Sequence, residues 1–186
     1  MKKGVMRPGH IQIRVLDLDE ALKHYRDVMG LIEVDRQGDK AFLKAWTEVD
    51  KYSIILREAD EAGMDFFSFK VVDEATLDSL RQDLINYGLQ VTDKPAGDLP
   101  DCGRRVQFDL PTGHTIELFA TKEQTGKWGV SNRNPEAWPL KLSGMRINRF
   151  DHCLLYGDDI DGVLDIFENV LGFKLAEEAV EPDGNK

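Results

Sequence analysis

The sequence predicts an α+β fold that is built from a repeated unit of one strand, one helix and further strands. Three observations support this prediction. Apolar residues alternate with a period of two in residues 10–15, and they recur every three or four residues between Asp17 and Gly30. The same order of elements returns near residue 66 and, in part, near residue 152. Period two is typical of a half-buried strand and period 3.6 of an amphipathic helix, and a unit that repeats indicates internal duplication.

The first unit has clear helix boundaries. Asp17 and Asp19 are N-cap candidates for a helix whose apolar stripe includes Leu22 and Tyr25. Gly30 is suited to the left-handed conformation in which helices often end. The strands predicted for this unit cover residues 10–15, 41–46 and 52–56.

The second unit follows the same plan. Asp73 can cap a helix that carries Leu77, Leu80 and Leu84 on one face, and Gly88 can end it. The strands predicted for this unit cover residues 66–72, 89–91, 104–108 and 115–119. The two units therefore predict a pair of βαβββ modules, which we expect to form a first domain over residues 1–122.

A segment rich in proline and glycine interrupts this pattern after the second unit. Prolines and glycines mark irregular structure. Trp128 and Trp138 nevertheless argue against a free linker, because indole rings are usually packed. We therefore predict that residues 123–148 form a connector that lies against a folded surface.

The opening unit returns after the connector at a constant shift of 142 residues, which places His152 on His10. The predicted cap, helical stripe and closing glycine recur at the same spacing. The matched positions are Asp17 and Asp159, Leu22 and Leu164, Tyr25 and Phe167, Val28 and Val170, and Gly30 and Gly172. We therefore predict that His152 begins the first strand of a third unit.

This third unit has no partner in the sequence. A unit of this size seldom buries enough apolar surface to fold alone. We therefore predict that residues 149–186 begin a second domain and that the chain is the front part of a longer protein. The apolar side chains expected to face strands of that absent part are Cys153, Leu155, Val163, Phe167 and Val170.

Composition and charge exclude several classes of protein. The chain has 24 basic and 34 acidic residues among 186, and hence a formal net charge of −10. It therefore lacks the basic surface typical of nucleic-acid binders and of proteins that attach to anionic membranes. Its two cysteines form neither a disulfide framework nor a thiolate metal motif, which favours a reducing compartment. With no secretory signal and no apolar run near the ~18 residues of a membrane span, we expect a cytoplasmic protein.

Two strand positions in the first two units have the chemistry of metal ligands. His10 is predicted on a first strand and Glu117 on a last strand, and they form two thirds of the 2-His-1-carboxylate set that suits non-haem Fe(II). The third ligand would come from residues 66–70, which contain no His, Asp, Glu or Cys. We therefore interpret His10 and Glu117 as buried, hydrogen-bonded residues of a module without metal.

His152 is the remaining candidate ligand. One imidazole cannot hold iron, but His152 could do so together with a second His and a Glu from later strands. The alternative interpretation is a core histidine without a metal.

Six stretches of the sequence are distinctive: KGVMRPGH (3–10), LKAWTEVDK (43–51), LREAD (56–60), CGRRV (102–106), TGKWG (125–129) and NPEAWP (134–139). They resemble the catechol 2,3-dioxygenases, an extradiol dioxygenase family within the vicinal oxygen chelate superfamily. The resemblance extends over essentially all 186 residues and matches roughly the first three-fifths of that family's chain.

The resemblance implies an oxidoreductase that cleaves catechol with O2 in the meta position to give 2-hydroxymuconic semialdehyde. It implies a homotetramer of two-domain chains, with Fe(II) in the second domain only. His152 matches the first iron ligand and Leu154 is expected in the wall of the substrate pocket, whereas His10 and Glu117 match vestigial positions. The other ligands and the acid–base residues would lie beyond Lys186, so we expect the 186-residue chain alone to be inactive.

Two other functions are compatible with the repeated units. A glyoxalase-like isomerase or lyase would use the first pair of units and would need a third metal ligand. A binding module that sequesters small molecules would use the same pair of units and no metal.

Overall fold

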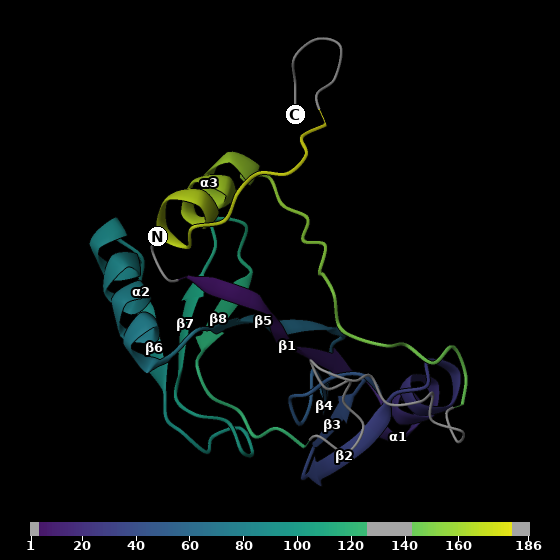
Figure 1. Ribbon diagram of the computed structural model, residues 1–186. Helices are drawn as coiled ribbons and strands as arrows, with labels where there is room; N and C mark the ends of the chain where they lie inside the picture. Colours follow the sequence, from purple (N-terminus) through teal and green to yellow (C-terminus); the bar gives the residue numbers. More distant parts are fainter. Residues whose placement is uncertain (1–3, 126–142, 180–186) are drawn as a thin grey trace.

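The structure is a computed structural model that describes residues 4–125 and 143–179. Within these residues the strands form one curved, mixed sheet of eight strands in the order β2-β3-β4-β1-β5-β8-β7-β6 (Figure 1). The strands are β1 (Val5–Val15), β2 (Ile32–Gln37), β3 (Lys40–Lys44), β4 (Ile54–Glu58), β5 (Gly63–Val71), β6 (Val91–Lys94), β7 (Arg105–Asp109) and β8 (Thr115–Phe119). The α-helices are α1 (Leu18–Lys23), α2 (Glu74–Tyr87) and α3 (Ile160–Asp165). The predicted α+β class is confirmed.

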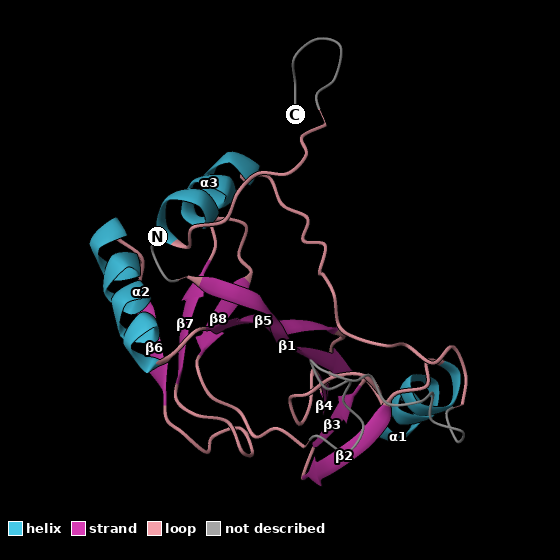
Figure 2. Ribbon diagram, in the orientation of Figure 1, coloured by secondary structure: helices cyan, strands magenta, loops and turns pink. Residues whose placement is uncertain are grey.

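The sheet consists of two halves with the same strand order. β1 pairs in parallel with β4, and β5 pairs in parallel with β8. From the middle of the sheet outward, the strands of the first half are β1, β4, β3 and β2, and those of the second half are β5, β8, β7 and β6. The halves join through antiparallel pairing of β1 with β5. Helix α1 contacts β3 and β4 of the first half, and α2 contacts β5, β6 and β8 of the second (Figure 2). This topology confirms the predicted pair of βαβββ modules.

Some strands differ from the prediction at the edges of the sheet. The sequence pattern predicts no strand at β2. This strand is only partly buried, because it has a neighbouring strand on one side alone. β6, at the opposite edge, covers Val91–Lys94 and not residues 89–91, and two of its four residues are exposed. Exposed edge strands carry a weak apolar pattern, so their limits are poorly marked in the sequence. Across the described part of the chain, no helix has the length and apolar character needed to span a membrane.

The first helix ends in a wider turn than the sequence predicts. After α1 the chain forms a π-helical turn (His24–Val28), in which the Met29 N–H donates to the His24 carbonyl at 3.0 Å. Gly30 follows with a φ of +80°. A Cβ at this position would lie 2.3 Å from the Ser143 carbonyl oxygen, so the close approach of the later chain also requires glycine.

The helical part of the third unit reproduces this geometry. α3 is followed by a π-helical turn (Ile166–Val170), and every bound of the two elements is shifted by 142 residues from α1 and its turn. The Asp159 side chain caps α3, as the Asp17 side chain caps α1. Gly172 has a φ of +78°, close to that of Gly30. The repeat predicted from the sequence is therefore confirmed for the helix and its end.

The first strand predicted for the third unit is absent. Residues 146–159 form no strand, so the expectation that His152 begins one is wrong for the described chain. A strand exists only where a neighbour satisfies its backbone N–H and C=O groups. In the first unit β4 and β5 do this for β1, and the corresponding strands of a third unit are not among the described residues.

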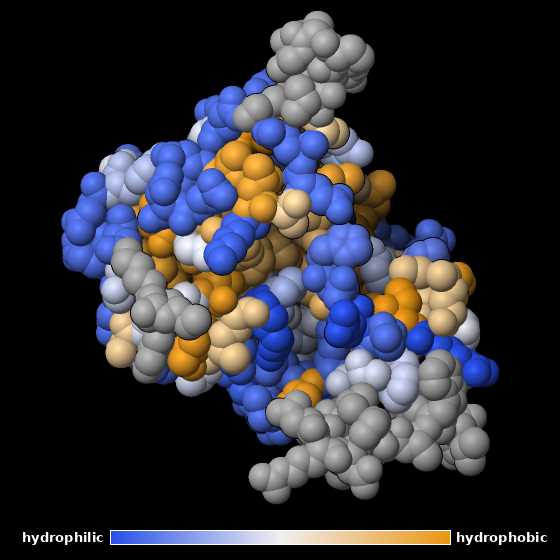
Figure 3. All heavy atoms as spheres, turned by 45° about the horizontal axis from the view of Figure 1, so that its top comes forward, coloured by the Kyte–Doolittle hydropathy of each residue, from blue (hydrophilic) through white to orange (hydrophobic). Residues whose placement is uncertain are grey.

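The apolar face of the third-unit helix packs against the second half of the sheet. Val170 is buried in the same hydrophobic cluster as β5 and α2. The Phe69 ring on β5 lies 5.9 Å from the Phe167 ring and 5.1 Å from the Phe173 ring. In the described chain Phe167 and Val170 therefore pack on this sheet, and the expectation that they face strands of an absent part stays a prediction. Apolar surface still gathers on the face of the molecule that Figure 3 shows. Leu154 of the third unit is 70% exposed.

Both described ends of the predicted connector contact the first unit. The Thr125 N–H donates to the Val49 carbonyl at 3.2 Å, and the Met145 N–H donates to the Val28 carbonyl at 2.7 Å. Trp128 and Trp138, on which the prediction of a packed connector rests, lie outside the described residues.

Ile166→Ala tests the packing of the third-unit helix. Ile166 is 1% exposed in the shared hydrophobic cluster, so its truncation should lower the free energy of unfolding by about 3 kcal/mol. The measurement is urea-induced unfolding followed by circular dichroism. Ile160→Ala is the matched control, because Ile160 is 59% exposed and should change stability by less than about 0.5 kcal/mol. Equal effects of the two substitutions would contradict this packing.

Candidate functional site

His10 is turned into the sheet interior by a β-bulge in β1. Pro8 pairs with Phe69 and Ile11 with Phe67, so Gly9 and His10 together oppose a single residue of β5, Ser68. A bulge of this kind redirects a side chain and leaves a backbone group unpaired. The Ser68 hydroxyl accepts the freed His10 N–H at 2.7 Å.

The bulge brings His10 next to Glu117. Glu117 on β8 is in register with Ser68 on β5, so three adjacent central strands supply the residues of this site. The His10 Nε2 atom lies 3.0 Å from the Glu117 Oε1 atom, and both side chains are fully buried. The structure thus brings together the two residues that the sequence predicts as a pair.

Ser68 occupies the strand position from which a third metal ligand was expected. Its hydroxyl lies 2.8 Å from both the Nδ1 atom and the carbonyl oxygen of His10. A neutral hydroxyl that is engaged in this way is a poor substitute for an imidazole or a carboxylate. The pair therefore has no strong third donor from β5.

The side chain of Lys122 fills the space beside His10. The sequence pattern does not predict Lys122 as a residue of this site. Its Nζ atom lies 2.7 Å from His10 Nδ1 and donates to the Tyr52 carbonyl at 3.2 Å. The ammonium group also lies over the rings of Tyr52 and Phe119, with 4.2 Å and 4.6 Å to their centroids, as in cation–π contacts. Burial lowers the pKa of Lys122 to about 8, so the side chain still carries its charge near neutral pH.

The lysine fixes the protonation of His10. Burial, and then the charges of Lys122 and Arg105, lower the pKa of His10 well below its usual value, so its ring is neutral. Because an ammonium group can only donate, it requires Nδ1 as an acceptor. The ring proton is therefore on Nε2, which faces the Glu117 carboxyl.

Glu117 is surrounded by further donors on its other side. The Gln107 Nε2 atom donates to Glu117 Oε2 at 2.8 Å, and Arg105 Nε lies 3.5 Å from the same oxygen. Burial raises the pKa of Glu117 to about 7, and Arg105, Gln107 and Lys122 oppose this shift. The Arg105 guanidinium thus lies beside the carboxyl that a metal ion would need as a ligand, and the charge of Lys122 also acts on this carboxyl.

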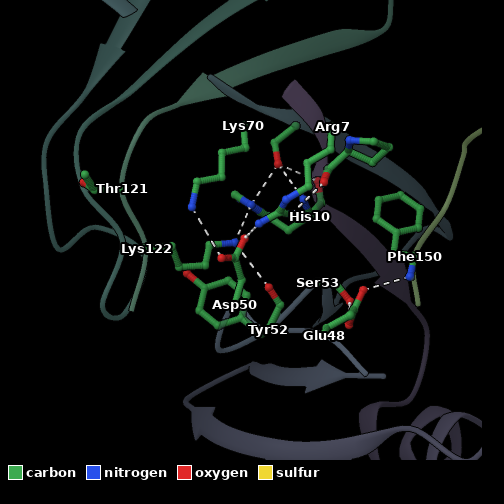
Figure 4. A network of polar contacts seen from close by, with 12 residues as sticks. Arg7, His10, Glu48, Asp50, Tyr52, Ser53, Lys70, Thr121, Lys122 and Phe150 are labelled. Carbon is green, nitrogen blue, oxygen red and sulfur yellow. Dashed lines mark hydrogen bonds and ion pairs between the residues drawn. The ribbon is translucent and has the colours of Figure 1, made fainter. Parts of the chain in front are cut away.

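Asp50 balances the charge at the rim of this network (Figure 4). Its carboxylate lies 2.6 Å from the Arg7 guanidinium and 3.5 Å from the Lys70 ammonium. Burial acts to raise the pKa of Asp50, but Arg7, Lys70 and Lys122 outweigh it and lower that pKa. The described interior of the first two units is therefore filled by an ionic network around His10, Glu117 and Lys122.

The other predicted ligand, His152, lies apart on the open segment 146–159. Its side chain is 85% exposed, and its Nδ1 atom is 3.3 Å from the Asp151 carboxylate. Asp151 also pairs with Arg149 at 2.7 Å, and Leu154 is exposed on the same segment. Over residues 4–125 and 143–179, no three His, Cys, Asp or Glu side chains converge closely enough to hold a metal ion. The described chain therefore provides His152 as an isolated donor.

The chain matches a family model described as "Catechol 2,3-dioxygenase-like N-terminal domain" over residues 64–123. It is 60% identical to a metapyrocatechase from Pseudomonas sp. (strain CF600) over 187 positions, which cover 100% of this chain and 61% of the relative. It is 25% identical to a manganese-dependent 2,3-dihydroxybiphenyl 1,2-dioxygenase from Geobacillus genomosp. 3, over 95% of this chain and 56% of the relative.

A solved structure supports the same relationship. The 2,3-dioxygenase LapB from Pseudomonas sp. KL28 superimposes with a TM-score of 0.91 and 48% identity, over 100% of this chain and 65% of that chain. The chain thus spans about three-fifths of the length of the relatives that it matches.

Glu117→Gln tests the protonation of the buried network. Folding raises the pKa of Glu117 from 4.5 to about 7, so between these values the folded chain keeps a proton that the unfolded chain has lost. The stability of the unmodified chain relative to the variant should therefore fall as the pH rises through this window, by on the order of 3 kcal/mol. Urea unfolding of both proteins at a series of pH values provides the measurement. A difference that stays constant across the window would show that the pKa of this carboxyl is not raised.

Proposed function

We propose that this chain, which is related by sequence over its whole length to the catechol 2,3-dioxygenases, serves in the extradiol cleavage of catechol. The observation that carries the proposal is the 60% identity to a metapyrocatechase over all of this chain. The reaction inserts both atoms of O2 and opens the aromatic ring beside the two hydroxyl groups, so catechol and O2 are the proposed partners. Because the chain covers 61% of that relative, the activity is proposed for a protein that contains this chain and a C-terminal part like the relative's.

We propose that the work is divided between the units. Residues 1–122 form a domain without metal, because Lys122 at His10 Nδ1 and Arg105 at Glu117 Oε2 flank the His10–Glu117 pair on both sides. Residues 123–148 connect it to a second domain that begins at residue 149. This division is supported by the shift of 142 residues between the helices of the first and third units.

We propose His152 as one ligand of an Fe(II) ion and Leu154 as part of the pocket wall. One residue separates them, and both side chains are exposed, so both are accessible to a further part of the protein. The described residues alone do not fit a metal ion, since nowhere among them do three His, Cys, Asp or Glu side chains gather, and His152 has the Asp151 carboxylate as its neighbour. A 2-His-1-carboxylate set would suit Fe(II), and the relative named as manganese-dependent is only 25% identical to this chain.

We propose a cytoplasmic homotetramer as the working form. The location is supported by the composition, with two cysteines and a net charge of −10. The assembly is proposed from the family resemblance, and the exposed apolar surface on the third unit is compatible with burial in a larger structure.

The alternative functions are less well supported. A glyoxalase-like reaction in the first pair of units would need a third ligand, and the β5 position holds Ser68. A module that sequesters small molecules would need a cavity between the units, where Lys122, Tyr52 and His10 pack against one another.

The proposal predicts which protein binds iron. The 186-residue chain should bind no stoichiometric Fe(II) and should release no yellow ring-fission product from catechol. The same chain, joined to the C-terminal two-fifths of the Pseudomonas sp. CF600 relative, should do both. His152→Ala in this chimera should weaken Fe(II) binding by more than the roughly 10–100-fold that is typical of losing an outer-shell partner.

Metal analysis and a visible-absorbance assay provide the measurements. His24→Ala is the matched control, because His24 is exposed on the first helical segment and should leave both properties unchanged. Stoichiometric iron in the 186-residue chain, or in the His152→Ala chimera, would refute the proposed role of His152.

A further inference from the structure

Glu48 lies in the loop of residues 45–53, between β3 and β4, and its carboxylate accepts three hydrogen bonds. The Oε2 atom accepts from the Ala45 N–H at 2.7 Å and from the Ser53 hydroxyl at 2.6 Å. The Oε1 atom accepts from the Phe150 N–H at 2.8 Å, across 102 residues of sequence (Figure 4). One side chain of the first unit is thus bound to the backbone of the segment that carries His152.

The 45–53 loop is a rigid support for this contact. The Ser53 backbone is held on both sides, because its N–H donates to the Leu43 carbonyl and its carbonyl accepts from the Ile11 N–H, each at 2.9 Å. Asp50 in the same loop is 3% exposed and pairs with Arg7 and Lys70. The buried ionic network therefore holds the loop at Asp50, and the sheet holds it at Ser53.

The segment on the other side of the contact is held at two places. Thr47, next to Glu48, donates to the Asn148 carbonyl through its N–H at 3.2 Å and through its hydroxyl. The Phe150 ring packs edge-on against the Phe67 ring of β5, with 5.5 Å between centroids. His152 follows Phe150 by two residues, which span at most roughly 7 Å of chain.

We propose that Glu48 is a positioning residue for His152, because it fixes the backbone from which the imidazole projects. The inference rests on the proposed function of His152 as a metal ligand. The imidazole is 85% exposed, and the contact that the structure gives it is with the adjacent Asp151. Its position is therefore set by its backbone, and on the N-terminal side the nearest fixed points of that backbone are the N–H and ring of Phe150.

The chemistry of the contact explains why a carboxylate is required. Ala45 and Phe150 each present an N–H, and Ser53 presents a hydroxyl, so three donors converge on two oxygens. A glutamine has one oxygen, and its amide nitrogen would face one of these donors. Glu48→Gln therefore keeps the size of the side chain but removes a hydrogen bond on one side of the link between the 45–53 loop and Phe150. We call this link the Glu48 bridge.

The Glu48 bridge itself is tested by amide hydrogen exchange in the 186-residue chain. In Glu48→Gln, exchange of the Phe150 amide should rise roughly tenfold or more, as expected for the loss of a hydrogen bond to a charged group, while amides in α2 and β5 stay protected. Glu61→Gln is the matched control, because Glu61 is exposed and lies outside this network. Thr47→Val, which removes only the hydroxyl contact to Asn148, serves as a milder second variant and should raise exchange in the same segment by less.

The effect on His152 is tested in the chimera with the C-terminal part of the Pseudomonas sp. CF600 relative. Glu48→Gln should weaken Fe(II) binding by roughly 10-fold, within the range for partners that orient a ligand, and should leave the KM for catechol of the iron-loaded enzyme unchanged. Glu61→Gln should change neither quantity.

The outcomes separate the two proposals. Unchanged exchange at Phe150 in both Glu48→Gln and Thr47→Val, or faster exchange with unchanged Fe(II) affinity, overturns the role of Glu48. Unchanged Fe(II) affinity in His152→Ala overturns the proposed function instead, whatever the exchange of Phe150 shows.

Discussion

The antiparallel junction of β1 with β5 is the constraint on which the rest of the structure depends. It joins two four-stranded halves, and the bulge at Gly9 and His10 lies within it. Gly9 is needed there, because a Cβ would lie 2.2 Å from the Phe119 ring. The bulge turns His10 inward, and the parallel pairing of β5 with β8 places Glu117 opposite it. The ionic network, and through Asp50 the 45–53 loop, are built on this junction.

The sequence was most informative where a residue type satisfies a local requirement. Aspartates 17, 73 and 159 cap their helices as predicted, and the glycine after each helix has a positive φ. It was least informative where a neighbouring strand decides the structure. β2 forms because β3 lies beside it, and residues 146–159 form no strand because no such neighbour is present among the described residues. The residue pattern of one segment does not indicate whether a second strand lies beside it.

The sequence predicts only some residues of the candidate site, again because neighbouring strands bring the others to it. The repeat positions of His10 and Glu117 marked them as a pair, and their contact follows from the strand order. Arg105 and Gln107 could also have been predicted from the sequence, because residues two apart share one face of a strand. Both lie on β7, where Gln107 is in register with Glu117. Lys122 was not, since it follows β8 without any spacing that marks it as buried. A long side chain can reach a site from a backbone position that carries no pattern.

The ammonium of Lys122 gives the first pair of units a property that a metalloprotein domain lacks. Its cation is tethered by a covalent side chain, so no chelator can extract it and no change in metal supply can leave the space empty. The acceptors around it, His10 Nδ1 and the Tyr52 carbonyl, have their hydrogen-bond donor from the moment the chain folds. These two units therefore fill their interior with side chains of the chain itself, independently of any supply of metal ions.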